Sequence, residues 1–530
     1  MRNAHQVAAI RAAEQALMAR LPQGTLMQRA AAGLASVCAG LAGRVYGARV
    51  VVLAGSGDNG GDALYAGARL ARRGARVVAV AAGSRLHAGG AAALKAAGGR
   101  VTGPDDPGLL ATIGAAGLVI DGLLGIGGRG GLRDAQAALA GLVARAGPGP
   151  RPGRLGRPLT VAVDLPSGID ADTGEVAGTA IRADVTVTFG TWKPGLLIDP
   201  GAGYAGVVER IGIGLEPYLP APDAMAPLAG DIAALLPSPG RDSDKYRRGV
   251  LGVVAGSERF TGAAALAVGG AIHGGAGLVR LVSAEPAVAV VRQHWPEAVI
   301  TLTRAGPPAG DEVTAAGRVQ AWLAGPGMGT DEDARRRLRA VLGTELPVLV
   351  DADGLTLIAQ DHGLVTGRGA ATLLTPHAGE LARLLGADPA DVAARRVEHA
   401  RAAAAALSAT VLLKGSTTII APPPDPGGPG PVLVNTTGTS WLATAGTGDV
   451  LSGLAGALLA QGLSAPHAAL AAAFLHGLAA RGAAGGSLTD AGTPGLTDGR
   501  ASSGAGDAPI GASDVIRALP GAIRSVRRLL

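Results

Sequence analysis

The chain has 530 residues, a formal net charge of +6, and hydrophobic residues at 48% of its positions. That length corresponds to roughly three to four average domains, or to two larger α/β domains with substantial cores. The 86 glycines follow no three-residue repeat, which excludes collagen. The arginines are scattered among very few aromatic residues, so we expect a solvated basic surface and no nucleic-acid partner. The single cysteine, Cys38, cannot form an internal disulfide, so we expect a cytoplasmic protein.

The N-terminal segment, residues 1–21, predicts an amphipathic helix and lacks the basic and apolar regions of a signal peptide. The most apolar stretch, residues 465–484, is interrupted by His467, His476 and Arg481. We therefore expect no membrane span and no membrane partner. We also expect the chain to form a homo-oligomer.

In the first half, β-prone runs alternate with Ala/Leu-rich runs, which is typical of a parallel α/β sheet. A segment rich in Pro, Gly and Arg, residues 147–158, interrupts this series and predicts a surface insertion. The predicted strands are Val50–Ala54, Arg76–Val80, Leu118–Asp121, Thr160–Asp164, Asp184–Thr188 and Val207–Ile211.

A Pro-rich stretch, Glu216–Pro227, separates a second alternating series from the first. Residues 485–513 are rich in Gly, Ser, Thr and Asp and predict a loop or disorder, and a last helix is expected over Ser513–Leu530. The second set of predicted strands is Val250–Val254, Leu278–Val282, Ala321–Ala324, Pro347–Asp351, Ala371–Leu374 and Thr410–Leu413. Two α/β domains, residues 1–216 and 225–530, follow from this pattern.

Lysine and asparagine are scarce, with four lysines (Lys95, Lys193, Lys245, Lys414) and three asparagines (Asn3, Asn59, Asn435). A compositional bias against Lys and Asn removes them wherever another residue can substitute. The Lys and Asn residues that remain are therefore enriched at positions that need their specific chemistry. Asn59 and Lys414 both fall within motifs, whereas Lys95 lies on an ordinary Ala-rich helix.

The first motif, Gly55-Ser-Gly-Asp-Asn-Gly-Gly-Asp62, follows a predicted strand and precedes a helix expected from Ala63. Its glycines satisfy G-x-G-x-x-G, a turn whose backbone N–H groups can face a phosphate. A dinucleotide-binding dehydrogenase would carry an acidic residue about twenty positions later, but none occurs between Asp62 and Asp105. The oxygen-bearing side chains of the turn favour a cation or a sugar hydroxyl in addition to a phosphate.

Two further aspartates, Asp121 and Asp164, end predicted strands of the same sheet. Asp121 leads into the glycine-rich run 122–131, and Asp164 leads into Leu-Pro-Ser-Gly. Residues past the carboxyl ends of parallel strands line the ligand crevice, so we expect these loops and the Gly55 turn to converge.

On these motifs, residues 1 to about 215 resemble NAD(P)H-hydrate epimerase, with Asp58 in place of the first Asn of the family's N-N-G-G-D. The resemblance implies a Rossmann-like three-layer sandwich and a K⁺ ion held by Asn59, Asp121 and Ser167. It implies Asp164 as the acid/base group and a structural or site-edge role for Lys193. Implied substrate contacts are Asp58, Asn59, Gly60, Gly61, Asp62, Gly125, Ile126, Gly127, Gly128, Arg129, Gly130, Gly131 and Asp164.

A second constellation, residues 445–453, reads Ala-Gly-Thr-Gly-Asp-Val-Leu-Ser-Gly and opens an apolar helix. Small residues at a helix N-terminus form an anion hole for a phosphoryl group. Asp449 is placed there to accept a proton from a substrate hydroxyl. The arrangement resembles the ribokinase-like superfamily, whose fold is an α/β/α sandwich.

Five earlier motifs precede it in order, and together they resemble the ADP-dependent NAD(P)H-hydrate dehydratase over residues 225–530. They are Gly262-Ala-Ala-Ala265, Gly325-Pro-Gly-Met-Gly329, Asp351-Ala-Asp-Gly354, Thr375-Pro-His-Ala-Gly-Glu380 and Lys414-Gly-Ser-Thr-Thr418. The family implies substrate contacts from Ala263, Gly329, His377 and Asp449. It implies nucleotide contacts from Lys414, Gly415, Ser416, Thr417, Thr418, Gly446 and Gly448.

The resemblance implies repair of hydrated NADH and NADPH (NADHX and NADPHX). One domain interconverts the R and S hydrates, and the other dehydrates the S form with ADP and Mg²⁺, giving AMP and phosphate. Phosphorylation turns the C6 hydroxyl into a good leaving group, with Asp449 as the base. Three alternatives stay open: an ATP-dependent kinase of a small vitamin-like alcohol, an NADP oxidoreductase, and a nucleotide-sensing module without turnover.

Overall fold

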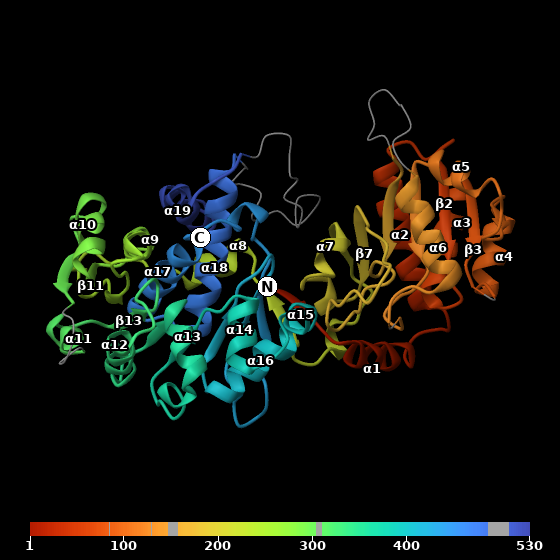
Figure 1. The fold of residues 1–530 in the computed structure, drawn as a ribbon. Helices are drawn as coiled ribbons and strands as arrows, with labels where there is room; N and C mark the ends of the chain where they lie inside the picture. The colour runs from red at the N-terminus through yellow and green to blue at the C-terminus, as the bar shows by residue number, and fades with distance from the viewer. Residues whose placement is uncertain (84, 129, 147–156, 304–309, 486–507) are drawn as a thin grey trace. The chain divides into compact units, whose positions relative to one another are not determined.

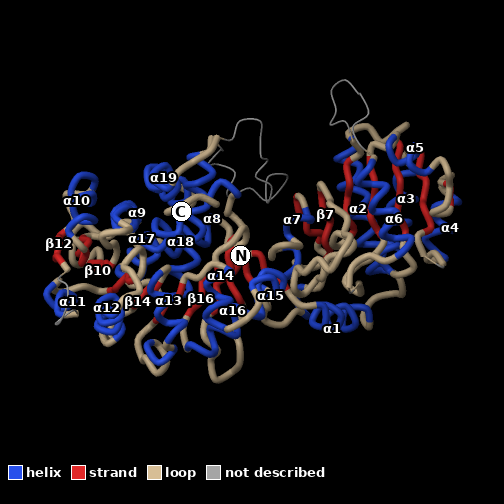
Figure 2. Tube along the Cα trace, viewed as in Figure 1, coloured by secondary structure: helices blue, strands red, loops and turns tan. Residues whose placement is uncertain are grey.

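The computed structural model describes residues 1–83, 85–128, 130–146, 157–303, 310–485 and 508–530. The chain divides into two compact units, one spanning Asn3–Ala224 and one that begins at Met225 and also includes Met1 and Arg2. Each unit contains a mainly parallel sheet with helices on both faces (Figure 1; strands in red in Figure 2). The expected pair of three-layer α/β sandwiches is therefore confirmed.

The sheet of the first unit has seven parallel strands in the order β4-β3-β2-β5-β6-β7-β8. The chain builds outward from β2 to β4 and then returns to the other side of β2, so a topological switch point lies between β2 and β5. Ligands of open α/β sheets bind beyond the carboxyl ends of the strands at such a point. The strands are β2 (Arg49–Ala54), β3 (Arg76–Ala81), β4 (Arg100–Thr102), β5 (Leu118–Gly122), β6 (Leu159–Val163), β7 (Val185–Phe189) and β8 (Val207–Ile211).

Two hydrophobic cores lie on the two faces of this sheet. One core joins alternate strand residues such as Val50 and Val52 to α1, α2, α3 and α4. The other joins Val51 and Leu53 to α5 and α6. Strand residues alternate between the faces, so one buried strand serves both cores. The helices are α1 (Val7–Met18), α2 (Thr25–Ala42), α3 (Asp58–Arg72), α4 (Ala88–Ala96), α5 (Leu109–Gly114) and α6 (Asp134–Arg145).

Two predictions for this unit were wrong in extent. The N-terminus begins with a short strand, β1 (Arg2–Ala4), before α1, so the helix does not cover the whole segment 1–21. Helix α3 begins at Asp58, five residues before the expected Ala63, because Asp58 suits the positive end of the helix dipole. Gly60 also permits the early start, since a Cβ there would lie 2.2 Å from the carbonyl oxygen of Gly55.

The second sheet has eleven strands in the order β1-β9-β18-β17-β16-β15-β14-β13-β10-β11-β12. The strands from β16 to β12 run parallel, and β17 and β18 are antiparallel additions. Its switch point lies between β10 and β13. The strands are β9 (Ala224–Ala226), β10 (Val250–Val254), β11 (Leu278–Ser283), β12 (Val299–Leu302), β13 (Ala321–Ala324), β14 (Val348–Val350), β15 (Thr372–Leu374), β16 (Thr410–Leu413), β17 (Thr418–Ala421) and β18 (Val432–Asn435).

Helices cover both faces of this sheet as well. One core contains α8 (Ala229–Leu235), α9 (Thr261–His273), α10 (Glu285–His294), α17 (Thr447–Ala460), α18 (Ala465–Ala483) and α19 (Ala512–Arg527). The other contains α11 (Asp311–Ala315), α12 (Glu332–Leu342), α13 (Asp353–Gln360), α14 (Ala378–Leu385) and α16 (Arg396–Leu407).

All twelve predicted strands are present within one or two residues, and α19 confirms the expected last helix. Within the described residues, six further strands were not predicted (β1, β4, β9, β12, β17 and β18), and β9 lies inside Glu216–Pro227, the Pro-rich stretch expected to separate the two halves. Within the described ranges, no helix has the length and apolarity needed to cross a bilayer. Most of the predicted insertion 147–158 and of the predicted loop 485–513 lies outside the described residues.

Candidate active sites

In the first unit, the carboxyl ends of β2, β5, β6 and β7 carry the predicted site residues. Asn59, Asp121 and Ser167, from three separate loops, meet around the backbone of Leu124. The Asn59 Nδ2 donates to the Leu124 carbonyl oxygen at 3.0 Å, and the Ser167 Oγ lies 3.1 Å from that same oxygen. The expected convergence of these loops is confirmed.

Asp121 is fully buried and is held by Ser167, whose backbone N–H donates to one carboxylate oxygen at 2.9 Å and whose Oγ donates to the other at 2.7 Å. Burial raises the pKa of Asp121 to about 6, while the hydrogen bonds from Ser167 and Leu123 oppose that rise. Gly125 lies against the cluster of Asn59, Asp121 and Ser167, since a Cβ at Gly125 would lie 3.1 Å from the Asn59 Oδ1. The cluster offers oxygen donors only, which suits a hard cation.

Asp164 follows β6 with a left-handed backbone (φ +68°) that turns its carboxylate toward β7. There it is held by an ion pair with Lys193, and its Oδ1 accepts hydrogen bonds from the Phe189 N–H at 3.2 Å and the Thr188 Oγ1 at 3.3 Å. The Lys193 side chain is 1% exposed and also donates to the Phe189 carbonyl oxygen at 3.1 Å. The surviving lysine thus neutralises the predicted acid/base group, a role more specific than the expected site-edge position.

Two further carboxylates lie close to Asp164. Asp62 is buried, and its Oδ1 has no hydrogen-bond partner within the described chain. Burial raises the pKa of Asp62 well above its usual value, and the carboxylates of Asp164, Asp58 and Glu14 add to the shift. Burial also raises the pKa of Glu14, assisted by Asp164. Glu14 belongs to α1, which was not predicted to contribute to this site.

The glycine-rich loop after β5 borders the same region. Its backbone turns through a hydrogen bond from the Gly128 N–H to the Gly125 carbonyl oxygen at 2.9 Å, and Gly130 and Gly131 have φ of +74° and +80°. Gly127 faces α1, where a Cβ would lie 3.2 Å from an Arg11 guanidinium nitrogen. Ile126 packs against the nearby apolar cluster, and the predicted contact Arg129 lies outside the described residues.

In the second unit, a buried carboxylate organises the site. Asp351, 1% exposed at the end of β14, accepts a hydrogen bond from the Lys414 Nζ at 2.8 Å and another from the Ser452 Oγ at 2.6 Å. The Glu380 carboxylate lies 3.7 Å from the same Lys414 Nζ. Burial alone would lower the pKa of Lys414, but the carboxylates of Asp351 and Glu380 raise it above its usual value.

Asp449 lies in the first turn of α17, which follows Gly446 in the left-handed conformation (φ +85°). Burial, followed by repulsion from Asp351, raises the pKa of Asp449 to about 7, although Lys414 opposes the shift. Gly448 lies beside the Lys414–Asp351 pair, since a Cβ there would lie 3.5 Å from the Lys414 Nζ. The predicted lysine, glycine turn and aspartate therefore share one site.

The remaining predicted nucleotide contacts form the hairpin between β16 and β17. Gly415 and Ser416 are exposed at its tip, whereas Thr417 and Thr418 are buried. The Arg396 guanidinium stabilises the hairpin by donating a hydrogen bond to the Thr417 carbonyl oxygen at 3.0 Å.

The predicted substrate contacts lie on neighbouring loops. The Gly329 N–H donates to the Asp353 Oδ2 at 2.9 Å, and Gly327, in the same loop, faces Ala263, with a hypothetical Cβ 2.9 Å from the Ala263 Cβ. His377 caps α14, because its Nδ1 accepts from the Gly379 N–H at 3.0 Å. Its side chain is 57% exposed, so this cap leaves the ring open to a ligand.

Five residues of these sites have roles that the sequence did not predict. Lys193 was expected only to have a structural or site-edge role, and no role was predicted for Glu14, Asp351, Glu380 and Ser452. Asp351 and Glu380 stood within recognised motifs, and the scarcity of lysine marked Lys193. Ser452 stood within the recognised run 445–453 but was given no role, and no pattern in the sequence pointed to Glu14. Both residues act from helices that approach the strand ends only in the folded chain.

Two family models match the chain: "YjeF-related protein N-terminus" over residues 23–195 and "NAD(P)H-hydrate dehydratase" over residues 251–494. A Mycobacterium leprae protein described as "Bifunctional NAD(P)H-hydrate repair enzyme Nnr" is 46% identical over 487 residues, covering 91% of this chain and 94% of that protein. The chain belongs to this family of bifunctional NAD(P)H-hydrate repair enzymes. The family resemblance expected from the motifs is thereby confirmed.

One further family member and one solved structure are also similar to this chain. The family member of the same name from Mycobacterium tuberculosis is 47% identical and covers 88% of this chain. The solved structure is an ADP/ATP-dependent NAD(P)H-hydrate dehydratase from Bacillus subtilis, co-crystallised with ATP/Mg²⁺; it is 27% identical, with a TM-score of 0.45, and covers 56% of this chain and 97% of its own.

Proposed function

We propose that this chain repairs hydrated NADH and NADPH in two steps, with residues 1–216 as the epimerase and 225–530 as the ADP-dependent dehydratase. The observation that carries the proposal is the site at the start of α17. There a half-buried carboxylate, Asp449, stands beside the Lys414–Asp351 pair and an open helix N-terminus. This arrangement combines a base, a cation and an anion hole, which phosphoryl transfer requires.

In the dehydratase step, Asp449 accepts the proton of the C6 hydroxyl while its oxygen bonds to the terminal phosphorus of ADP. The bond from that phosphorus to AMP breaks as the new bond forms. The C6–O bond then breaks with phosphate leaving, driven by the ring nitrogen lone pair, and loss of a proton from C5 restores the dihydronicotinamide. Lys414, held in place by Asp351, offsets the charge of the phosphates.

In the epimerase step, Asp164 takes the proton from the C6 hydroxyl as the C6–N bond breaks, which leaves an aldehyde at C6 and the electron pair on the ring nitrogen, conjugated with the carboxamide. The nitrogen then attacks the opposite face of the aldehyde, and Asp164 returns the proton to the oxygen. Lys193 fixes the position of the carboxylate through the buried ion pair. The backbone turn at residues 55–62 and the loop 125–131 are the proposed contacts for the dinucleotide, and Ala263, Gly329 and His377 those for the hydrate in the second site.

The donor sets fit the two cations that the family implies. Asn59, Asp121 and Ser167 would hold K⁺, which would add positive charge beside the dinucleotide phosphates. The carboxylates of Asp353 and Glu380 both act on the pKa of Asp449, so they lie close enough to the proposed nucleotide site to hold Mg²⁺ there together with the nucleotide. Mg²⁺ would neutralise the phosphates during transfer.

The experiment is recovery of 340 nm absorbance from an equal mixture of R and S NADHX with ADP. The full chain is expected to restore all of the absorbance. Asp164→Asn is expected to restore the S half quickly and the rest only at the spontaneous rate, and Asp449→Asn is expected to restore almost none. No recovery with ADP, together with ATP-dependent phosphorylation of a vitamin alcohol, would contradict the proposal and favour a kinase.

A further inference from the structure

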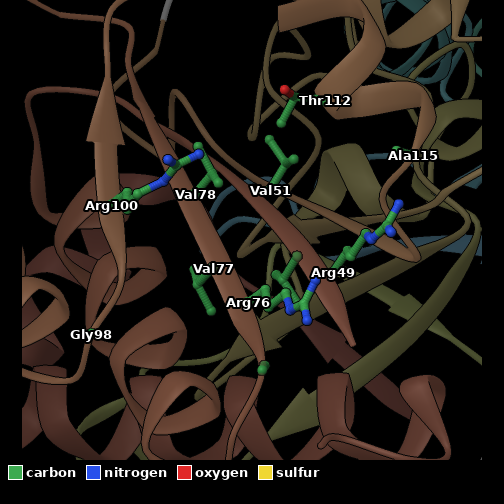
Figure 3. Close-up of a pocket in the computed structure, with 11 residues that line it drawn as sticks. Arg49, Val51, Arg76, Val77, Val78, Gly98, Arg100, Thr112 and Ala115 are labelled. Carbon is green, nitrogen blue, oxygen red and sulfur yellow. The ribbon is translucent and has the colours of Figure 1, made fainter. Parts of the chain in front are cut away.

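Three arginines stand at the amino-terminal ends of adjacent strands in the first unit, at the opposite end of the sheet from the predicted epimerase site. Arg49 begins β2, Arg76 begins β3 and Arg100 begins β4. Arg49 and Arg76 are direct cross-strand partners, and Arg100 is the partner of Val78. Figure 3 shows the three arginines on these neighbouring strands.

The strand registers place the three side chains on one face of the sheet. Paired residues of parallel strands point the same way, and so do residues two positions apart along one strand, such as Arg76 and Val78. That face is the one covered by α5, because Val51 and Val80 pack with Leu109 and Ile113 there. The arginines therefore surround a common space and do not point to opposite sides.

That space is a cavity of about 430 Å³, within the range of small-molecule sites. Val51 and Val78 contribute apolar lining, and Thr112 of α5 contributes a hydroxyl. None of its eleven lining residues bears a carboxylate, so the lining carries a formal charge of +3.

The positive charge is poorly compensated by the protein. Within the described part of the chain, the guanidinium groups of Arg49, Arg76 and Arg100 make no hydrogen bond or ion pair. Asp106 is a carboxylate that interacts with one of these arginines, and only weakly. Its pKa is lowered chiefly by the hydrogen bond from Thr102, and Arg100 makes a smaller contribution. Like charges on adjacent strands repel one another, so a bound anion would stabilise this edge of the sheet.

We propose that this cavity is a second binding site, separate from both active sites, for a small molecule that carries a pyrophosphate group. Adjacent strands are about 4.8 Å apart and successive residues rise about 3.3 Å, so the Cα atoms of Arg49 and Arg100, two strands and two residues apart, are separated by roughly 12 Å. A diphosphate can engage several guanidinium forks across that span, each fork binding two oxygens. Nucleotides and free inorganic pyrophosphate share this chemistry.

The test is calorimetric titration of the full chain with inorganic pyrophosphate at low salt. The variant R49S/R76S/R100S is expected to lose one pyrophosphate site per chain. Each single substitution is expected to weaken that site about tenfold. Competition by ADP or NADPH for the arginine-dependent site would identify nucleotides as its ligands, whereas competition by neither would identify free pyrophosphate.

The matched control is R44S/R72S/R73S, which removes three exposed arginines and the same charge from the same unit outside the cavity. This control is expected to keep the number of sites of the wild type. Equal numbers of sites and equal affinities in all three proteins would overturn the proposal. Retained epimerase and dehydratase rates without pyrophosphate would show that both triple variants are folded.

Discussion

The two active sites use the same components in opposite ways. Each places a scarce lysine and several carboxylates beyond the ends of parallel strands. In the first unit Lys193, 1% exposed, is bound to Asp164, the proposed acid/base group itself. In the second, Lys414 is one-fifth exposed and is bound to Asp351, while the pKa of Asp449 is raised by burial and by its neighbours. In the first site the proposed acid/base group is fixed by its ion pair, whereas in the second site the proposed base has a pKa near neutrality.

The largest expected effect tests the role of Asp449. Asp449→Asn should lower the dehydratase rate by a factor of about 10²–10⁴, because the amide cannot accept the hydroxyl proton. Epimerase activity should be unchanged, since its site lies in the other unit. Steady-state rates of both reactions measure this, and an Asn variant with more than half of the normal dehydration rate would remove Asp449 from the mechanism.

The next effect concerns stability. Lys193→Met should destabilise the first unit by about 3–5 kcal/mol, because it leaves the Asp164 carboxylate buried without its partner. Hydrogen exchange of the β6 and β7 amides would report the loss. The double variant D164N/K193M should recover much of it, since no buried charge remains. Lys414→Met should cost less, because that lysine reaches solvent and Ser452 still binds Asp351. Equal losses of stability in Lys193→Met and Lys414→Met would contradict the proposed difference between the two ion pairs.

The dehydratase should depend on pH through Asp449. Its pKa of about 7 makes the ionised base scarce below neutrality, so the rate should rise with pH and be about tenfold lower at pH 6 than on the plateau above pH 8. Asp351→Asn should shift this rise to lower pH, because it removes the neighbouring charge that contributes most to the elevation. A rate that falls between pH 6 and 8 would contradict the assignment.

The smallest effect concerns the support of Asp351. Ser452→Ala removes one hydrogen bond to this buried carboxylate and should cost about 1 kcal/mol, with Lys414 still bound. The denaturant midpoint of the second unit would measure the loss. A change greater than that of Lys414→Met would mean that the serine, and not the lysine, holds Asp351.

The sequence predicted both sheets and most of the site because the evidence was local. Val-rich runs predicted the strands, polar residues at or after the strand ends indicated Asn59, Asp121, Asp164 and Lys414, and the family resemblance supplied Ser167. The start of α3 was misplaced because two glycines argue against a helix locally. In the structure, tight packing of Gly60 against Gly55 favours the helix despite that preference.

Residues that act across the fold were harder to predict. Glu14 reaches the epimerase site from α1, and Ser452 reaches Asp351 from the second turn of α17, 101 positions away in sequence. The antiparallel strands β17 and β18 are short, and their pairing depends on contacts that no repeat in the sequence encodes. Local patterns therefore identify strand ends better than the side chains that support them.

The most direct test of the account follows the C6 oxygen of the substrate. S-NADHX labelled with ¹⁸O at the C6 hydroxyl would be converted in a single turnover with ADP, using Asp164→Asn protein to prevent exchange by the epimerase. Attack of that hydroxyl on phosphorus predicts one ¹⁸O in each molecule of inorganic phosphate released. Unlabelled phosphate together with ¹⁸O-labelled water would contradict it.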